Sequence, residues 1–328
     1  MRREDFTVGW ICAVQTESVA ACELLDEEYD SPTIGSLHDN NAYSFGRIGD
    51  HHIVIACLPK GRYGTVSAAS VAKDMLRSFE SIRIGLMVGI GGGAPSKKHD
   101  IRLGDVVVGC PMHRAGGVIP YNFGKAIQDK KLEQAGSLNS PPQFLLTALA
   151  KLSAHHERKG SQIAESVDEM VTKNPRLRAK YQRLGAEHDK LYESTYVHCG
   201  GDGGCEGHCD SASPPLLQRP QRDPSSEELV VHYGLIASAD NLMKDAITRD
   251  QLIEEHDILC FEMEAAGLMN DFPCVVIRGI CDYSDSHKNH RWQGYAAATA
   301  ASYAKELLGI IPGHHIVGER TAIAEMGE

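Results

Sequence analysis

Residues 84–95 read IGLMVGIGGGAP, an apolar run that passes directly into a stretch of glycines. The run predicts a buried β-strand over 84–90, and the glycines predict a loop at its end whose bare backbone lets a small ligand approach closely. The letters also satisfy the G-x-G-x-x-A pattern of dinucleotide-binding loops, but Pro95 and a polar segment follow where that site needs the first turn of a helix. We therefore expect ligand contact at Gly91 and Gly92, with a tight structural turn as the alternative.

Similar apolar runs rich in Val and Ile recur along the chain and alternate with helical patterns, which is typical of an α/β fold. We predict a single domain over residues 1–313, a twisted, mostly parallel mixed β-sheet flanked by helices. Strands are expected near 7–14, 42–48, 52–58, 84–90, 104–110, 231–237, 258–263 and 273–280. Helices are expected over 16–27, 64–80, 141–155, 240–255, 264–270 and 294–310.

Two segments depart from this alternation. Residues from about 153 to 230 are polar and then rich in Gly, Pro, Ser and Arg, so we interpret them as an insert that serves as a lid, a binding loop or a disordered connection. Within the insert, the charged stretch Lys173–Lys190 is expected to be a solvated helix. Pro312-Gly313 ends the last expected helix, and residues 314–328 are expected to form a C-terminal tail.

Composition argues against several classes of protein. The 328 residues include 33 Lys+Arg and 44 Asp+Glu, and the net charge of −11 argues against nucleic acid or an anionic membrane as the main partner. No apolar run approaches the roughly 18 to 20 residues that span a bilayer, and the first residues lack the apolar stretch of a secretory signal. We expect a cytoplasmic protein whose ten cysteines are mostly reduced and buried.

Acidic residues follow three of the expected strands at the point where each strand ends. Glu17 follows the first strand, Glu262 and Glu264 the seventh, and Asp282 the last. On strand-to-helix turns of a parallel sheet, such acids face the crevice in which α/β proteins bind ligands. Taken singly, Glu17 has the alternative of a helix first-turn acid, and the Glu262/Glu264 pair that of an ion pair to Arg278 or of a solvated strand end.

These segments resemble, in the same order, the nucleoside phosphorylase and nucleosidase superfamily, and most closely its fungal branch. The resemblance covers nearly all of residues 6–312 and implies a homo-oligomer, either a dimer or a trimer. It is carried by AVQTE (13–17), VGIGGGAP (88–95), GDVVV (104–108), YGLIASAD (233–240), FEMEAA (261–266) and RGICD (278–282).

The resemblance implies a role for each acid. Glu264 corresponds to the glutamate that holds the ribose 2′- and 3′-hydroxyls, with Met263 packing on the sugar and Glu262 in support. Asp282 corresponds to the general acid that protonates purine N7 as the base leaves. Glu17 corresponds to the glutamate that orients and deprotonates the attacking water in the hydrolytic members, which resemble methylthioadenosine nucleosidase.

The sequence also departs from the family pattern. The first turn lacks the Gly-Asp-Pro-x-Arg loop with which the phosphorolytic members bind phosphate, and Ile90 and Cys281 stand where many members have Ser. These departures favour hydrolysis. The apolar neighbours Ile280, Cys281 and Tyr283 are expected to raise the pKa of Asp282 by desolvation, as a general acid near neutral pH requires.

Further residues are expected to bind the base and a 5′-phosphate chain. Leu242 and Met243 resemble the purine-stacking position, with core packing on a helix as the alternative. In an acidic protein, local basic clusters are expected to receive a phosphate chain, with ordinary solvated surface as the alternative. These clusters are Lys60 with Arg62, Arg219 with Arg222, and Lys288 with Arg291.

Five soft side chains gather between residues 198 and 209. Their irregular spacing lacks a paired C-x2-C, so we favour free thiols over a structural zinc site and predict no metal ligands. The proposed reaction needs neither a metal nor another cofactor. The five residues are His198, Cys199, Cys205, His208 and Cys209.

The sequence therefore predicts a purine nucleosidase that hydrolyses the N-glycosidic bond of adenine nucleosides or nucleotides, adenosine or ATP, and releases the free base. The first alternative is a phosphate-dependent purine nucleoside phosphorylase. The second is a non-catalytic nucleotide-sensing module, because fungal relatives often form the N-terminal part of larger immune-receptor-like proteins. An oxidoreductase would rest on the glycine loop alone. We expect no nucleic-acid or membrane partner.

Overall fold

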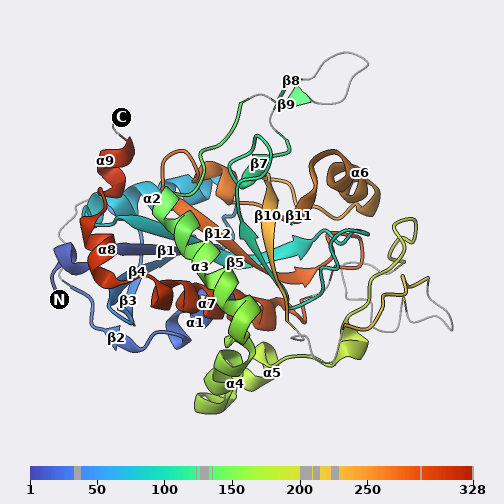
Figure 1. The fold of residues 1–328 in the computed structure, drawn as a ribbon, viewed down its shortest axis with the longest axis horizontal. Coiled ribbons are helices and arrows are strands. Elements are labelled where there is room, and N and C mark those ends of the chain that lie inside the picture. The colour runs from blue at the N-terminus through green and yellow to red at the C-terminus, as the bar shows by residue number, and fades with distance from the viewer. Residues whose placement is uncertain are drawn as a thin grey trace.

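A twisted β-sheet forms the centre of the molecule (Figure 1). The computed structural model describes residues 1–32, 38–122, 124–125, 133–134, 136–199, 209, 215–222, 229–288 and 290–326. Its main sheet consists of β1 (Val8–Cys12), β2 (Glu27–Tyr29), β3 (Tyr43–Ile48), β4 (His51–Cys57), β5 (Ile84–Gly93), β6 (Val106–Gly109), β7 (Val118–Pro120), β10 (Val231–Ser238), β11 (Ile258–Glu262) and β12 (Cys274–Asp282). A separate pair is formed by β8 (Gly124–Lys125) and β9 (Glu133–Gln134).

The sheet is mixed and mostly parallel, which confirms the predicted fold class. Strand β1 pairs in parallel with β4 and β5, β5 with β12, and β10 with β6, β7 and β11. Antiparallel pairs are β2–β3, β3–β4, β6–β12 and β5–β11. Because β11, β10, β6, β12 and β5 are joined in that order, the β5–β11 pairing at Gly92 and Gly93 closes this half of the sheet on itself. The ends of β5, β11 and β12 are thereby brought together.

Helices cover both faces of the sheet, which explains why β5 and β12 are apolar throughout rather than alternating. Figure 1 shows α2 on one side and α1 and α7 on the other. Nearly every side chain of α7 is buried, because the helix packs between the sheet and α1, α3, α4 and α5. The helices are α1 (Gln15–Glu23), α2 (Thr65–Ser78), α3 (Gln143–Lys159), α4 (Ile163–Lys173), α5 (Arg178–Tyr181), α6 (Ala246–His256), α7 (Gln293–Ile310), α8 (Gly313–Gly318) and α9 (Ala322–Met326).

Two of the predicted helices differ from those in the structure. The helix expected over 240–255 begins at Ala246, because the Asp245 carboxylate caps its start by accepting the N–H groups of Ile247 and Thr248. Only a 3-10 turn, Ala265–Gly267, forms in the range 264–270.

The first part of the predicted insert is an integral part of the fold. Helix α4 packs against α7 and buries Ile163, Val167 and Met170. The helix expected over Lys173–Lys190 is wrong, since α4 ends at Lys173 and the short α5 follows. Tyr181 at the end of α5 is buried, and its hydroxyl donates to the carbonyl of Thr16 at 3.0 Å.

Residues after Pro312, in the range of the expected C-terminal tail, form α8 and α9. Ile316 is fully buried in the main core, and the N–H of Ala322 donates to the carbonyl of Ile82 at 2.8 Å. Apolar residues too few to show a helical period in the sequence are enough to dock a six-residue helix on an existing core.

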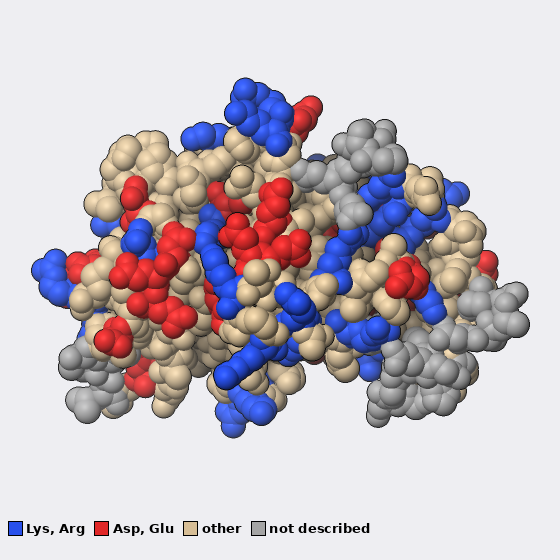
Figure 2. Space-filling model, turned by 90° about the horizontal axis from the view of Figure 1, so that it is seen from below, with Lys and Arg blue, Asp and Glu red and all other residues tan. Residues whose placement is uncertain are grey.

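No helix in the described part of the chain combines the length and the apolar character that crossing a membrane requires. On the face shown in Figure 2, acidic and basic side chains lie side by side in groups of both signs. This mixture accompanies the net charge of −11.

The docking of α8 predicts a measurable contribution to stability. Replacing Ile316 with Ala leaves a cavity in the core and should lower the free energy of unfolding by about 2–4 kcal/mol. The neighbouring Val317→Ala, at a side chain that is 62% exposed, should change it by less than about 0.5 kcal/mol. Urea denaturation of both variants checks this, and equal effects would show that α8 does not pack.

Candidate active site

One cavity of about 390 Å³ lies where the carboxyl ends of β1, β5, β11 and β12 meet. It holds the predicted acids together with the predicted glycines and apolar residues. The sequence-predicted residues that line it are Glu17, Gly91, Gly92, Leu242, Met243, Glu262, Met263, Glu264, Asp282 and Lys288. Further lining residues are Ala13, Val14, Thr16, Tyr63, Ile90, Asn241, Phe261, Cys281, Ser284, His290 and Gln293.

A fully buried arginine on β12 lies next to the two acids at the end of β11. The Arg278 guanidinium forms an ion pair with Glu262 and lies 3.6 Å from the carboxylate of Glu264. Glu262 also accepts the N–H groups of Glu264 and Ala265 at 3.0–3.2 Å. The ion-pair alternative considered for these acids is therefore correct for Glu262, which the pair holds beneath Glu264.

Glu264 faces the cavity with weaker contacts. Its carboxylate accepts the N–H groups of Met263 and Gly64 at 3.3 and 3.4 Å. Burial, together with the negative charge of Glu262, raises the pKa of Glu264 to about 7, against the opposing effect of Arg278. This carboxylate is thus available to accept hydrogen bonds from a ligand once it is ionised.

Glu17 occupies the first turn of α1 and is almost completely buried. One carboxylate oxygen accepts the N–H groups of Ala13 and Val14 at 2.6 and 3.1 Å, and the other accepts that of Ile90 at 2.8 Å. Burial raises the pKa of Glu17 above its usual value, while the charge of Arg278 and the three N–H donors oppose this shift. Glu17 is therefore a first-turn acid of α1, as the alternative interpretation expected. The same three hydrogen bonds also hold its carboxylate at the cavity.

Asp282 ends β12 and forms an ion pair with Lys288, with 2.9 Å between the Lys288 Nζ and the Asp282 Oδ2. The N–H of Ser284 donates to Oδ1 at 2.9 Å. The expected apolar surroundings are present, but the ammonium of Lys288 lies within them. Burial alone would lower the pKa of Lys288, yet the nearby carboxylate of Asp282 raises it, so the lysine is charged at neutral pH.

The glycines of β5 are required because these acids lie directly on its backbone. A Cβ atom at Gly89 would lie 2.4 Å from the Glu17 Oε1, and one at Gly92 would lie 2.7 Å from the Asp282 Oδ1. The glycines belong to β5, which runs to Gly93 rather than ending at residue 90 as predicted. No helix follows them, so the dinucleotide-binding interpretation has no structural basis.

Leu242 and Met243 lie in the loop before α6, not on a helix, and both line the cavity. Met243 also packs against a small apolar cluster that includes Phe261, so the core-packing alternative holds in part for Met243. Leu242 is exposed and Met243 is half-buried. Phe261 and the exposed Tyr63 also line the cavity and add ring surface that sequence reasoning missed.

The basic clusters divide into two kinds. Lys60 and Arg62 are exposed and lie beside the lining residue Tyr63, but neither lines the cavity itself. Arg219 and Arg222 do not line it either, and both are used inside the protein, which argues against their predicted contact with a phosphate chain. Arg219 pairs with Asp189 at 2.9 Å and donates to the hydroxyl of Tyr283 at 2.8 Å.

The Arg222 guanidinium donates a hydrogen bond to Oδ1 of the buried Asp105 at 2.8 Å. His232 contacts the same carboxylate at 3.0 Å. An aspartate buried to this degree needs such partners. Of the third cluster, Lys288 lines the cavity, whereas Arg291 contacts the ring of His188 at 3.4 Å.

Sequence reasoning also missed Ser284, which lies beside Asp282. Its backbone has a φ of 54°, unusual for a residue with a side chain, and its buried hydroxyl has no hydrogen-bond partner among the described residues. Since the hydroxyl lines the cavity, it is placed to meet a polar group of a ligand. The only signal in the sequence was its position in a loop directly after an acid that ends a strand.

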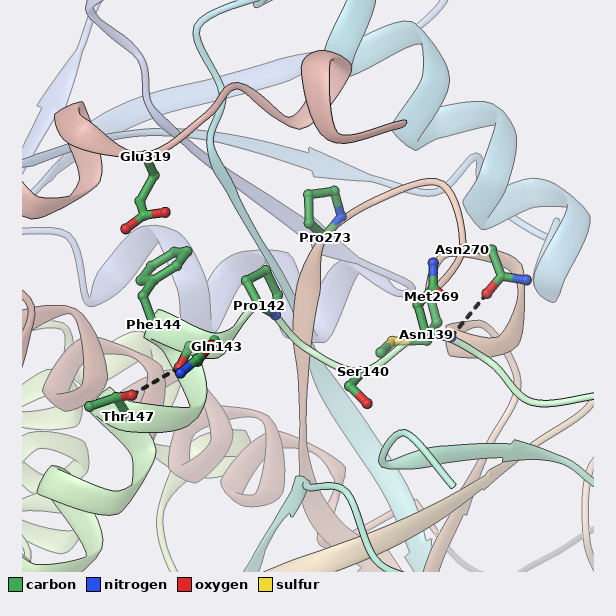
Figure 3. A pocket seen from close by; sticks show the side chains of 10 residues that line it. All are labelled: Asn139, Ser140, Pro142, Gln143, Phe144, Thr147, Met269, Asn270, Pro273 and Glu319. Atoms are coloured by element: carbon green, nitrogen blue, oxygen red, sulfur yellow. Dashed lines mark hydrogen bonds between the residues drawn. The ribbon is translucent and has the colours of Figure 1, made fainter. Parts of the chain in front are cut away.

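A second cavity, of about 720 Å³, lies where the start of α3 meets the turn at 269–273 (Figure 3). In this close-up the N–H of Asn139 donates to the side chain of Asn270 at 3.0 Å. Glu319 is the single acidic side chain among its described lining residues. The cavity offers no pair of acids, so it is the weaker candidate for catalysis despite its size.

Several solved structures share this fold. The Helicobacter pylori 5′-methylthioadenosine/S-adenosylhomocysteine nucleosidase superposes with a TM-score of 0.56 at 15% identity, covering 94% of this chain and 99% of that chain. The futalosine hydrolase of the same organism has a TM-score of 0.56 at 16% identity, with the same coverage of 94% and 99%. The chain therefore shares the fold of these two enzymes, as expected from the resemblance noted in its sequence.

Relatives in sequence extend this comparison. A nucleotide-binding leucine-rich repeat (NLR)-like protein from Hyaloscypha variabilis is 46% identical over 308 residues, which is 94% of this chain. The chain spans 30% of the length of that relative. A 5′-methylthioadenosine/S-adenosylhomocysteine nucleosidase from Mycobacterium bovis is 22% identical, covering 93% of this chain and 97% of the relative. No family model matches the chain.

The raised pKa of Glu264 predicts a pH dependence of stability. A carboxyl group that ionises near 7 in the fold and near 4.5 when unfolded binds its proton more tightly in the fold, so its contribution is lost as the pH rises between these values. The free energy of unfolding should therefore fall by about 1.4 kcal/mol per pH unit through this range on account of Glu264.

Glu264→Gln should remove this slope, and the exposed Glu254→Gln should retain it. Chemical denaturation between pH 5 and about 8 measures both. An unchanged slope in Glu264→Gln would contradict the assignment.

Proposed function

We propose that this chain is a purine nucleosidase that hydrolyses the N-glycosidic bond of adenine nucleosides or nucleotides. The observation that carries the proposal is the convergence of Glu17, Glu264 and Asp282 on one cavity from three distant parts of the sequence. Two acids at opposite sides of a scissile bond can serve the leaving group and the nucleophile separately. A third can hold the sugar.

In this mechanism, Glu264 binds the ribose. Its ionised carboxylate accepts hydrogen bonds from the 2′- and 3′-hydroxyls, and Met263 packs against the sugar. Glu262 and Arg278 hold Glu264 in place from beneath. Two hydrogen bonds to a buried carboxylate fix the sugar in one orientation, which brings C1′ toward the attacking water.

Asp282 serves the leaving base. As the bond from C1′ to N9 breaks, its electrons pass to the purine, which takes up a proton at N7. Asp282 delivers this proton after its carboxylate has received it from the charged ammonium of Lys288, 2.9 Å away. Leu242, Met243 and Phe261 provide apolar surface for the base.

Glu17 serves the water. The water oxygen forms the new bond to C1′, and its proton passes to the Glu17 carboxylate. Burial raises the pKa of this group, which makes it a stronger base than an exposed glutamate. Protons and electrons then balance, and the products are ribose or its 5′-substituted form and the free base.

The substrate proposed is adenosine or ATP. Lys60 and Arg62 are exposed beside Tyr63 at the cavity, a position from which they can contact a 5′-phosphate chain. Phosphorolysis of the same bond is the alternative reaction. A nucleotide-sensing module is a second candidate function, and it is favoured by the similarity to an NLR-like protein of which this chain spans only 30%.

We also propose that the protein acts in the cytoplasm as a homo-oligomer, a dimer or a trimer. Tyr63 and Leu242 line the cavity but are 55% and 46% exposed, so apolar surface lies open at its edge. A neighbouring subunit would cover these side chains and enclose the ligand.

The assignment predicts the outcome of a base-release assay. The protein should release adenine from adenosine or ATP equally well with and without phosphate. Asp282→Asn and Glu17→Gln should each lower kcat by about 10²- to 10⁴-fold. The exposed controls Asp50→Asn and Glu254→Gln should retain full activity. Chromatography of free base measures this, and parent-like turnover by Asp282→Asn would refute the mechanism.

The proposed phosphate contacts predict a split between substrates. Lys60→Glu and Arg62→Glu should each raise KM for ATP by roughly 10- to 100-fold, as expected for the loss of a charge-assisted contact, and should leave KM for adenosine nearly unchanged. Lys97→Glu, an exposed charge reversal elsewhere, serves as the control. Equal changes for both substrates would exclude these residues from phosphate binding.

A further inference from the structure

Outside the catalytic cavity, three soft side chains from two distant segments converge. His198 and Cys209 come from the predicted insert, and His287 comes from the loop after β12. Their ligating nitrogen and sulfur atoms all lie within 4.8 Å of one another. We propose that His198, Cys209 and His287 bind a zinc ion that fastens the insert to the active-site loop.

The spacing suits the ion. Tetrahedral zinc, with bonds of about 2.0–2.1 Å to nitrogen and 2.3 Å to sulfur, places neighbouring ligand atoms roughly 3.3–3.8 Å apart. The His198 Nδ1 and the Cys209 Sγ are 2.9 Å apart, and the whole group extends over 4.8 Å at most. The observed spacing is therefore within about 1 Å of that of a tetrahedral zinc site.

The surroundings already hold the ligands in place. The ring of His287 stacks on those of Tyr192 and Tyr196, with centroid distances of 4.0 and 5.2 Å. The backbone N–H of His198 donates to the Ser286 hydroxyl at 2.9 Å, which ties the insert to the residue preceding His287. Such outer contacts orient imidazole ligands in metal sites and lower the cost of assembling them.

The ligand types suit zinc and disfavour magnesium and calcium. One thiolate and two imidazoles match zinc, whereas magnesium and calcium prefer oxygen ligands. None of the three side chains lines the catalytic cavity, and Cys209 and His287 are buried, so the ion has a structural role. Three protein ligands leave one tetrahedral position for a fourth.

The sequence alone favoured free thiols because it showed only the cluster between residues 198 and 209. His287 lies far from that cluster in the chain, and the fold supplies it. Cys205 and His208 of the same cluster lie outside the described residues. Cys199, which is described, is exposed.

The proposed zinc site lies next to a residue of the catalytic cavity. Lys288 directly follows His287, and its ammonium is 2.9 Å from Asp282. A zinc ion on His287 therefore anchors the loop that carries Lys288. Because the three ligands come together only in the fold, zinc also stabilises the folded chain over the unfolded one.

The test is metal analysis of the full-length chain, purified without a metal-binding tag. The parent should contain about one zinc per chain, and Cys209→Ser and His287→Asn should contain less than about a tenth of an equivalent. The controls Cys110→Ser and His314→Asn should keep the metal. Chelation should lower the Tm of the parent and leave that of Cys209→Ser unchanged.

A measurement on the parent alone covers the case in which a variant fails to fold. Parent stripped of metal and loaded with cobalt(II) should show the intense visible bands of tetrahedral cobalt and a thiolate-to-cobalt charge-transfer band. A stripped parent that takes up neither zinc nor cobalt would overturn the proposal. So would full zinc content in both ligand variants, or a cobalt spectrum without the thiolate band. None of these readouts depends on nucleosidase activity.

Discussion

The structure depends on the neutralisation of one buried cation. Arg278 lies in the middle of β12 and has no exposed surface, where an unpaired guanidinium would cost several kcal/mol. Glu262 pairs with it directly, Glu264 lies 3.6 Å away, and Glu17 contributes its charge from the start of α1. The packing of three segments against one another is therefore fixed by a single charge.

The same cluster carries more negative than positive charge, and this excess accounts for its chemistry. Three carboxylates around one guanidinium cannot all be satisfied by it, so burial raises the pKa values of Glu264 and Glu17. A buried carboxylate that lacks full charge compensation is stabilised by an additional hydrogen bond or by protonation. In the proposed mechanism, the hydroxyls of the sugar donate hydrogen bonds to Glu264, and the attacking water gives its proton to Glu17. Removing Arg278 would thus disturb both the fold and the acids at once.

Much of the fold could be predicted from the sequence, because strands buried on both faces read as continuous apolar runs. The run expected at 273–280 is β12 at Cys274–Asp282, and the acids were found because each ends such a run. Errors arose where distant contacts decide the outcome. Ile316 docks a segment that looked like a tail, and the basic residues of the insert face buried carboxylates that local sequence cannot show. Ser284 lies in a loop, where no hydrophobic periodicity marks a position, and the pairing of Lys288 with Asp282 likewise depends on the fold.

The number of uncommitted cations at the cavity influences whether water or phosphate can act as the nucleophile of the proposed reaction. Among the described lysines and arginines, Lys288 alone lines the cavity, and Asp282 already holds its ammonium. Arg278 lies beneath and is committed to carboxylates, so a phosphate ion would approach Glu17 and Glu264 with no cation to offset the repulsion between like charges. Water bears no such penalty, and Glu17 is placed to take its proton. The charges that hold the fold together thus also favour hydrolysis over phosphorolysis.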